Sequence, residues 1–467
     1  MKNIKNRSIK IAFVLTVFTV FSCSEDFLEL TPQQSVATEN ALITLDDFRA
    51  AITGVYDGLS SSNYYGRYFV LVPDVMSDNV KQNASANRAK EWAEYSGNAT
   101  DFIPRNMWNQ MYDVINRANN IINSTVELAP AVKAEQDQII GEAYALRALV
   151  HHDLVRIYAQ TFNFTSGAAH PGIPIVTEFD QFAEPSRNTV NEVYNQIVSD
   201  LTTAISMMNA DRGSSTILSK LAVQGLLARV HLYRQDWANA EQLATEAING
   251  SSGLTSNAEY VNAWMAGTPP DAMFEIAMTS TDNRGSDALG RMYITEGYGD
   301  YLPSNDVISL IPVGDVREQL FKGDPNLSGI YGPVRVNKFP STTGEDNTPV
   351  LRLSEIYLIR AEARANLNND TGAQSDLNAI RQRGLSTAAD VTATGQALID
   401  EILLERRIEL MFEGHRLWDL MRNEMNVIRN QCSSIICEIN YPDNRFILPI
   451  PADEINANPN IKQNDGY

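Results

Sequence analysis

Basic residues, histidine and cysteine are all scarce in this chain of 467 residues. Its 37 Lys and Arg are outnumbered by 57 Asp and Glu, which gives a formal net charge of −20 at pH 7. This balance disfavours nucleic-acid binding, because contact with a phosphate backbone requires Lys and Arg to displace counterions. A polybasic patch for an anionic membrane surface is absent as well. The composition therefore predicts no nucleic acid among the partners of this protein.

Sequence motifs of catalysis are also absent. The chain contains no G-x-S-x-G, no H-E-x-x-H and no phosphate-binding glycine loop. His151 and His152 are adjacent on a predicted helix and point about 100° apart, which suits neither a shared metal nor a proton relay. Paired carboxylates for glycoside cleavage stay open as an alternative, because acids are abundant. We expect no enzymatic activity and no cofactor.

The N-terminus has the charge and hydropathy pattern of a secretory signal. The first ten residues carry four positive charges and no acid, and the apolar run 11–21 is interrupted only by Thr16 and Thr19. A membrane-spanning helix needs about 20 apolar residues, so this run is too short to span a bilayer. Residues 1–22 are therefore predicted to be a cleaved signal peptide.

A cysteine follows this run directly. Ser22 and Cys23 resemble a relaxed form of the lipobox of bacterial lipoproteins, so we predict lipidation at Cys23. Several acyl chains would be needed for stable anchoring, since one chain alone binds a membrane with an association constant of about 10⁴ M⁻¹. The acidic residues Glu25 and Asp26 resemble a signal that sends lipoproteins to the cell exterior. We expect an outer-membrane protein that is lipid-anchored and faces outward.

The two remaining cysteines, Cys432 and Cys437, are five residues apart. They have no histidine nearby and do not supply the four ligands of a structural zinc site. An exported chain meets an oxidising environment, where such a pair can close a short loop. We predict a disulfide between Cys432 and Cys437, and no metal site.

Helical periodicity dominates the mature chain. Apolar residues recur at three- and four-residue spacing, which is typical of amphipathic helices, in five segments: 101–123, 136–158, 189–208, 219–233 and 237–249. The last two, with small residues among the leucines, are similar to a tetratricopeptide repeat, and 351–384 is similar to a second copy. Such hairpins must stack on neighbours to bury their apolar faces. The sequence predicts a mainly α fold with an α-α superhelical scaffold.

The region between the two repeat-like hairpins has a different composition. Residues 250–350 are rich in Gly, Pro, Ser, Thr, Asn and Asp and lack a helical period. We expect an irregular, loop-rich insertion with few short strands, flanked by helical scaffold at about 40–250 and 350–425 and followed by a C-terminal segment, 425–467. Long loops on a rigid scaffold are common places for binding sites.

A stripe of three acids, Glu405, Glu409 and Glu413, lies in the predicted helical segment 398–422, in which we expect a break between two helices at Gly414. Like charges at this spacing repel by a few tenths of a kcal/mol per pair unless cations neutralise them. Arginines are the expected partners, and four are close in sequence: Arg406, Arg407, Arg416 and Arg422.

Ten segments together carry a family resemblance. In chain order they are the region of Cys23, WNQMYDVINRANNII, GEAYALRALVHHDLVRIYA, GIPIVTE with TVNEVYNQIVSDL, SKLAVQGLLARVHLYRQDWANA, YLPSND, LRLSEIYLIRAEA, LNAIRQRG, ERRIELMFEGHRLWDL and RFILPIPADEINANPNIKQNDGY. In this order they resemble the SusD/RagB family of outer-membrane nutrient-binding lipoproteins. The resemblance covers nearly all of the mature chain.

This resemblance implies a single domain, 23–467, of tetratricopeptide-like helical hairpins with an irregular face that carries the ligand site. It implies a non-catalytic protein that binds a glycan and delivers it to a SusC-like TonB-dependent β-barrel transporter in the outer membrane. Two alternatives stay open. One is a peptide- or protein-binding lid of the same architecture, and the other is a surface hydrolase on this scaffold.

A sugar presents an apolar C–H face and a hydroxyl rim, so its usual receptor is an exposed aromatic ring flanked by polar groups. Trp108, Trp237 and Trp418 lie in helical stripes or at a repeat turn and are predicted to be core residues. Trp92 and Trp264 remain as candidates for an exposed platform. The candidate ligand residues from the two loop-rich regions are Asp78, Arg88, Trp92, Tyr95, Asn98, Trp264, Tyr293, Tyr298 and Tyr301.

Overall fold

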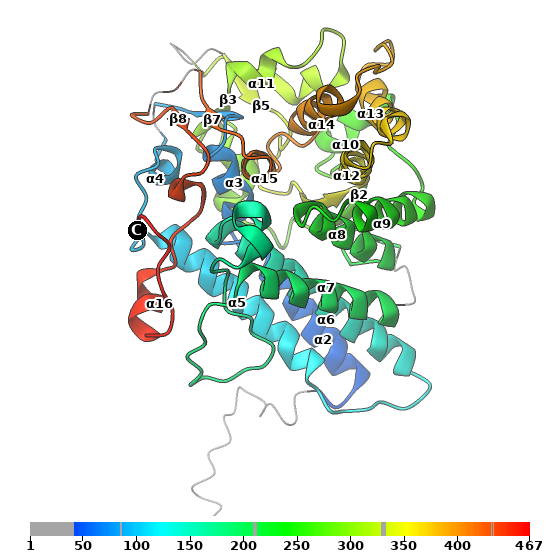
Figure 1. Ribbon diagram of the computed structural model, residues 1–467, viewed down its shortest axis with the longest axis vertical. Helices are drawn as coiled ribbons and strands as arrows, with labels where there is room; N and C mark the ends of the chain where they lie inside the picture. Colours follow the sequence, from blue (N-terminus) through cyan, green and yellow to red (C-terminus); the bar gives the residue numbers. More distant parts are fainter. Residues whose placement is uncertain (1–41, 85, 209–212, 328–332, 431, 433) are drawn as a thin grey trace, which may run out of the picture.

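The computed structural model describes residues 42–467, except 85, 209–212, 328–332, 431 and 433. The predicted signal peptide and Cys23 lie outside these residues. Helices form most of the structure (Figure 1). They are α2 (Leu45–Leu59), α3 (Tyr68–Val75), α4 (Lys90–Ala93), α5 (Phe102–Ile122), α6 (Lys133–Tyr158), α7 (Val190–Met207), α8 (Lys220–Tyr233), α9 (Trp237–Gly250), α10 (Asn257–Met265), α11 (Asn305–Ser309), α12 (Leu353–Asn366), α13 (Asp370–Gly384), α14 (Gly395–Glu409), α15 (Arg416–Arg422) and α16 (Ala452–Ala457).

The strands are short and pair in twos. They are β1 (Val80–Gln82), β2 (Ala272–Ile276), β3 (Tyr301–Pro303), β4 (Phe321–Gly323), β5 (Val334–Val336), β6 (Thr348–Arg352), β7 (Val427–Ile428) and β8 (Glu438–Ile439). The antiparallel pairs are β1 with β3, β2 with β6, β4 with β5 and β7 with β8. The predicted mainly α fold with few short strands is confirmed.

The repeat-like hairpins form as predicted and stack on each other. Helix α8 packs on α9, α12 packs on α13, and α9 packs on α12, although more than 100 residues separate the two hairpins in sequence (Figure 1). A Cβ atom at Gly225 would lie 2.8 Å from Leu351 Cδ2, so only glycine allows this close approach of α8 to the β6–α12 segment. Small residues in the repeat therefore set the spacing of the scaffold.

The insertion is more ordered than its composition indicated. It begins with α10, which the sequence did not predict because only Tyr260 and Trp264 of its nine residues are buried. Strand β2 pairs with β6, which joins the start of the insertion to its end, and β3 pairs with β1 from the N-terminal region. The irregular region is thus tied at both sides to the helical scaffold.

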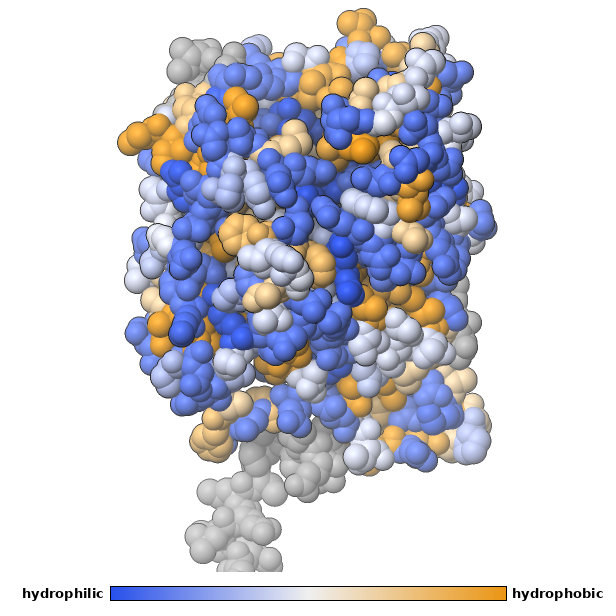
Figure 2. Space-filling model, in the orientation of Figure 1, coloured by the Kyte–Doolittle hydropathy of each residue, from blue (hydrophilic) through white to orange (hydrophobic). Residues whose placement is uncertain are grey.

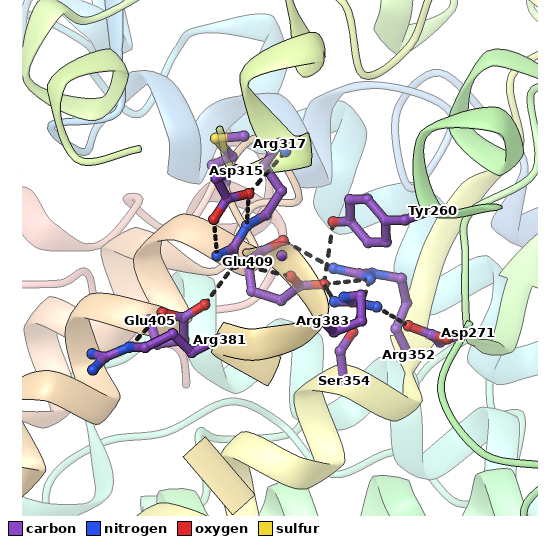
Figure 3. Close-up of polar contacts among 12 residues, drawn as sticks. Tyr260, Asp271, Asp315, Arg317, Arg352, Ser354, Arg381, Arg383, Glu405 and Glu409 are labelled. Carbon is purple, nitrogen blue, oxygen red and sulfur yellow. Dashed lines mark hydrogen bonds and ion pairs between the residues drawn. The ribbon is translucent and has the colours of Figure 1, made fainter. Parts of the chain in front are cut away.

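The core of this junction is a buried ion-pair network around Glu409, at the end of α14. Its carboxylate lies 2.7 Å from Arg383, 2.9 Å from Arg352 and 3.3 Å from Arg317, and it accepts a hydrogen bond from Tyr260 (Figure 3). Burial would raise the pKa of Glu409, but the three guanidinium groups outweigh it and hold the pKa well below its ordinary value. The residue is therefore a buried anion.

The expected partners of the acidic stripe were wrong. Glu405 pairs with Arg317 at 2.6 Å, and Glu413 pairs with Lys338 at 2.6 Å and with Arg352. None of these cations lies within 50 residues of the stripe. The nearby arginines pair elsewhere: Arg406 with Asp419, Arg407 and Arg416 with Asp78, and Arg422 with Glu362 and Asp419. Adjacent helical residues point about 100° apart, so closeness in sequence did not place these charges on one face.

The contribution of this network to the free energy of unfolding can be measured. We expect Glu409→Gln to lower the free energy of unfolding by about 3–5 kcal/mol, because it removes the anion that three buried arginines share. The matched control is Glu401→Gln on the same helix. Glu401 is 37% exposed and contacts Arg381 at 3.0 Å, so its loss should cost about 0–1 kcal/mol.

Urea denaturation followed by circular dichroism would compare the two variants. Equal midpoints for Glu409→Gln and Glu401→Gln would contradict the central role of the network.

Candidate functional site

The pairing of β1 with β3 brings together the two segments that hold most of the predicted ligand residues. Gln82 is opposite Tyr301 in the register. The loop after β1 and the loop before β3 therefore leave the strand pair at the same end. Asn83 strengthens this junction, since its backbone N–H donates to Asp300 O at 2.8 Å and its side-chain amide donates to Gly299 O at 2.8 Å.

Arg88 and Tyr298 meet at this junction. The guanidinium carbon of Arg88 lies 3.0 Å from the centre of the Tyr298 ring, in a cation–π contact. The same guanidinium contacts the buried Asp300 carboxylate at 3.3 Å, and the Arg88 backbone N–H donates to that carboxylate at 3.2 Å. Tyr301 donates a hydrogen bond from its hydroxyl to Arg88 O. The Arg88 side chain stays 28% exposed. We call Asn83, Arg88, Tyr298 and Asp300 the Arg88 cluster.

The Arg88 cluster has the chemistry for contact with a polyhydroxylated ligand. Arg88 supplies donors in a fixed plane, the Asn83 side chain supplies a neutral amide, and Tyr298 supplies a partly exposed ring. Asp300 lies beneath the arginine and orients it. Two of the predicted residues, Arg88 and Tyr298, are thus held together at the surface by two separate loops.

Four of the predicted aromatic residues do not form the exposed platform that we expected. Trp92, Trp264, Tyr293 and Tyr301 are each at most 2% exposed. Their rings therefore offer no face to solvent in this structure. The physical reason is that all four rings belong to the main hydrophobic core, where these large side chains supply apolar surface that the loops bury. The prediction that these four residues contact a ligand assumed exposed rings. Their burial argues for a packing role.

The partners of two of these rings explain their burial. The Trp264 indole packs edge-on against Phe339, with Lys338 Nζ 4.5 Å from its ring centre. Trp92 is covered by its own loop, since a Cβ atom at Gly97 would lie 2.6 Å from the indole. Both tryptophans are therefore core residues, like Trp108 and Trp418, whereas Trp237 is partly buried.

Three further predicted residues support the loops. Asp78 is buried and is bound by the Arg416 guanidinium at 2.8 and 2.9 Å. Tyr95 is half-buried and donates its hydroxyl hydrogen to Met76 O. Asn98 is exposed and donates from its side chain to Asp101, the residue before α5. Contact of these residues with a ligand stays a prediction.

The predicted disulfide between Cys432 and Cys437 is present. It closes the tip of the β7–β8 hairpin, whose Arg429 donates hydrogen bonds to Ser77 O and Val75 O at 2.8 and 2.7 Å. The Arg429 guanidinium also lies over the Tyr95 ring, at 4.5 Å. Arg429 therefore holds residues 75–77, which lead into β1 and the Arg88 cluster. Sequence reasoning did not identify it, because it lies in a segment without periodicity.

The described residues contain no group of three or more His, Cys, Asp or Glu side chains placed to hold a metal ion. His151 and His152 are buried on α6, and burial together with a nearby arginine lowers the pKa of each. Among the helices that the structure describes, none is long and apolar enough to span a bilayer.

Two family models match the chain. Residues 334–467 match the model described as the SusD family, and residues 26–232 match one described as starch-binding associating with outer membrane. The starch-binding protein SusD of Bacteroides thetaiotaomicron is 36% identical over 258 residues, which is 52% of this chain and 41% of that protein. A SusD-like protein of Formosa agariphila is 24% identical, with both chains covered completely.

Solved structures show the same similarity. A SusD superfamily protein from Bacteroides thetaiotaomicron is 30% identical, with a TM-score of 0.82 over 90% of this chain and 100% of that chain. A SusD superfamily protein from Bacteroides vulgatus is 28% identical, with a TM-score of 0.84 over 91% of this chain and all of that chain.

The pairing of Asp78 with Arg416 and Arg407 predicts how stability changes with pH. Burial would raise its pKa, but the hydrogen bond and charge of Arg416, with the charge of Arg407, lower the pKa below its ordinary value. The pairing therefore stabilises the fold fully above about pH 4 and is lost as the pH falls through the lowered pKa. We expect Asp78→Asn to lower the melting temperature at pH 7 and the difference from wild type to shrink on acidification.

Thermal unfolding at pH 7 and below pH 4 would measure this difference. A variant that melts like wild type at pH 7 but loses ligand affinity would instead assign Asp78 to ligand contact.

Proposed function

Because the chain belongs to the SusD family, we propose that it binds a glycan at the Arg88 cluster and delivers it to a partner outer-membrane transporter. The observation that carries this proposal is the Arg88 cluster itself. It is a partly exposed arginine, tyrosine and amide group, assembled from two loops by the β1–β3 pairing. Such a group matches the mixed apolar and hydroxyl surface of a sugar.

The family relationship supports the ligand class. The matching model for residues 26–232 is described as starch-binding, and the relative that is 36% identical is a starch-binding protein. The proposal extends this to a non-catalytic binding protein. Its ligand is an oligo- or polysaccharide, and its partner is a TonB-dependent β-barrel of the SusC type.

We further propose attachment to the outer membrane through acyl chains on Cys23, with the folded part facing the exterior. The apolar run before Cys23 and the acids after it support this location. The family description of association with the outer membrane agrees with it. The formal charge of the chain, −20, disfavours electrostatic attachment to anionic membrane lipid, so the acyl chains are the proposed anchor.

A peptide-binding lid of the same architecture is the second candidate. Arg88 would pair with a peptide carboxylate as readily as with a hydroxyl. The aromatic face of Tyr298 favours the sugar, because a pyranose presents C–H groups that pack on a ring.

The test measures binding of the chain from Ser24 onward to starch, laminarin and a peptide mixture by affinity electrophoresis and calorimetry. We expect retention by a neutral polysaccharide and about a ten-fold loss of affinity in Tyr298→Ala, equivalent to about 1.4 kcal/mol. Tyr357→Ala on α12 is the matched control. Tyr357 is also partly buried, with the Arg360 guanidinium 5.5 Å from its ring centre.

If the polysaccharide retains Tyr298→Ala as strongly as Tyr357→Ala, the Arg88 cluster is not the ligand site. Binding to peptides alone would overturn the glycan proposal and support the second candidate.

A further inference from the structure

A groove runs along one side of α5 and shares no lining residue with the Arg88 cluster. It consists of two hollows with cavity volumes of about 630 and 420 Å³, within the range of ligand sites in proteins. Both hollows are lined by Asp113, Asn116, Glu178 and Phe179. One wall is helix α5, and the other is the segment 174–183 between α6 and α7. We call this feature the α5 groove.

The second wall of the groove is held in place although it has no regular secondary structure. Tyr112 donates from its hydroxyl to Pro174 O at 2.9 Å, Asn119 donates to Val176 O at 3.1 Å, and Asn123 donates to Thr177 O at 2.8 Å. Arg147 in turn donates to the Asn119 side-chain oxygen, Oδ1, at 2.8 Å. Two residues of α5 and its C-cap residue, Asn123, therefore fix the extended segment, and the groove is preformed.

A second set of asparagines on α5 is not used in this way. Asn109, Asn116 and Asn120 line the groove, and their side chains form no hydrogen bond with any residue that the structure describes. Their spacing of seven and four residues puts all three on one side of the helix. Each amide offers both donors and an acceptor, which is the capacity that sugar hydroxyls require.

An exposed aromatic ring completes the groove. Phe179 is 64% exposed and lines both hollows, next to the free amide of Asn116. Phe182 is 81% exposed on the same segment but lines neither hollow. Figure 2 shows that polar and apolar side chains alternate over much of the visible face of the molecule. Phe179 is an exposed apolar ring in a groove that is otherwise lined mainly by Asn, Asp, Glu and other polar side chains.

The charges of the groove restrict its ligand. Asp113, Glu178, Asp180 and Glu454 contribute four carboxylates to the lining. Arg117 is the one cation among the described lining residues, and it is bound to Asp113 at 2.8 Å and to Gly54 O at 2.7 Å. An anionic ligand such as a uronic-acid or sulfated polymer would be repelled. The groove therefore suits an uncharged one.

We propose that the α5 groove is a second binding site for a neutral glycan chain, with Phe179 stacking on a sugar ring and Asn109, Asn116 and Asn120 contacting hydroxyls. The inference rests on the proposed glycan-binding function and adds a site to it. A short oligosaccharide would fill one site, whereas a polysaccharide could engage both and gain affinity through effective concentration.

The test compares Phe179→Ala with its matched control Phe182→Ala in the chain from Ser24 onward, because both rings are exposed and neither change should affect folding. The probes are starch and laminarin as neutral polymers and polygalacturonate as an anionic one. We expect Phe179→Ala to weaken binding to the neutral polymer that wild type retains by about ten-fold, and Phe182→Ala to bind like wild type. Asn116→Ala with Asn120→Ala should give a similar loss.

The outcomes separate the two proposals. If Tyr298→Ala loses affinity while Phe179→Ala keeps it, the α5 groove is not a glycan site and the Arg88 cluster stands. If both phenylalanine variants lose affinity equally, the α5 groove proposal falls, and the result for Tyr298→Ala decides the Arg88 cluster. If Phe179→Ala loses affinity and Tyr298→Ala does not, the groove stands and the Arg88 cluster falls. If polygalacturonate is the one polymer that retains the wild-type chain, the inference that the ligand is neutral is overturned. If wild type binds none of the polymers, both proposals fall together.

Discussion

The buried carboxylate of Glu409 is the point on which the arrangement of this fold depends. It lies at the end of α14 and is shared by three arginines that come from different parts of the chain: Arg317 from the insertion, Arg352 from β6 and Arg383 from α13. A buried charge without partners is costly, so the anion and the cations can be buried only together. The scaffold and the insertion are therefore locked into one arrangement by a requirement for charge balance as well as by apolar packing.

The same helix also reaches the candidate site from its other face. Arg407 of α14, with Arg416 of α15, binds Asp78 just before β1, and β1 pairs with β3 of the insertion. The loops of the Arg88 cluster leave this strand pair. Because α14 holds the insertion through Glu409 and the N-terminal loop through Arg407, it positions both sides of the site.

Much of the fold could be predicted because its helices have strong local signals. The repeat-like hairpins α8–α9 and α12–α13 were expected within a few residues, and the break at Gly414 matches its left-handed φ of 78°. Helix α10 was not predicted, since two buried residues in nine give no period. The few short strands were expected, but their positions and partners were not. For the candidate site, the sequence identified the two loops and the pair Arg88 and Tyr298. It selected Trp92 and Trp264 wrongly as exposed rings, because an aromatic residue in a polar segment has the same local pattern whether it is buried or exposed.

The sequence by itself determined the helical class, the repeat-like hairpins, the acidic charge and the pairing of Cys432 with Cys437, since each depends on composition or on residues close in the chain. The tertiary structure decided which charges meet, which aromatic rings are covered and where grooves lie. Glu409 finds its partners 26 to 92 residues away, and the asparagines of α5 divide into those that hold the segment 174–177 and those that face the groove. Such choices depend on contacts between distant segments, and no local pattern encodes them.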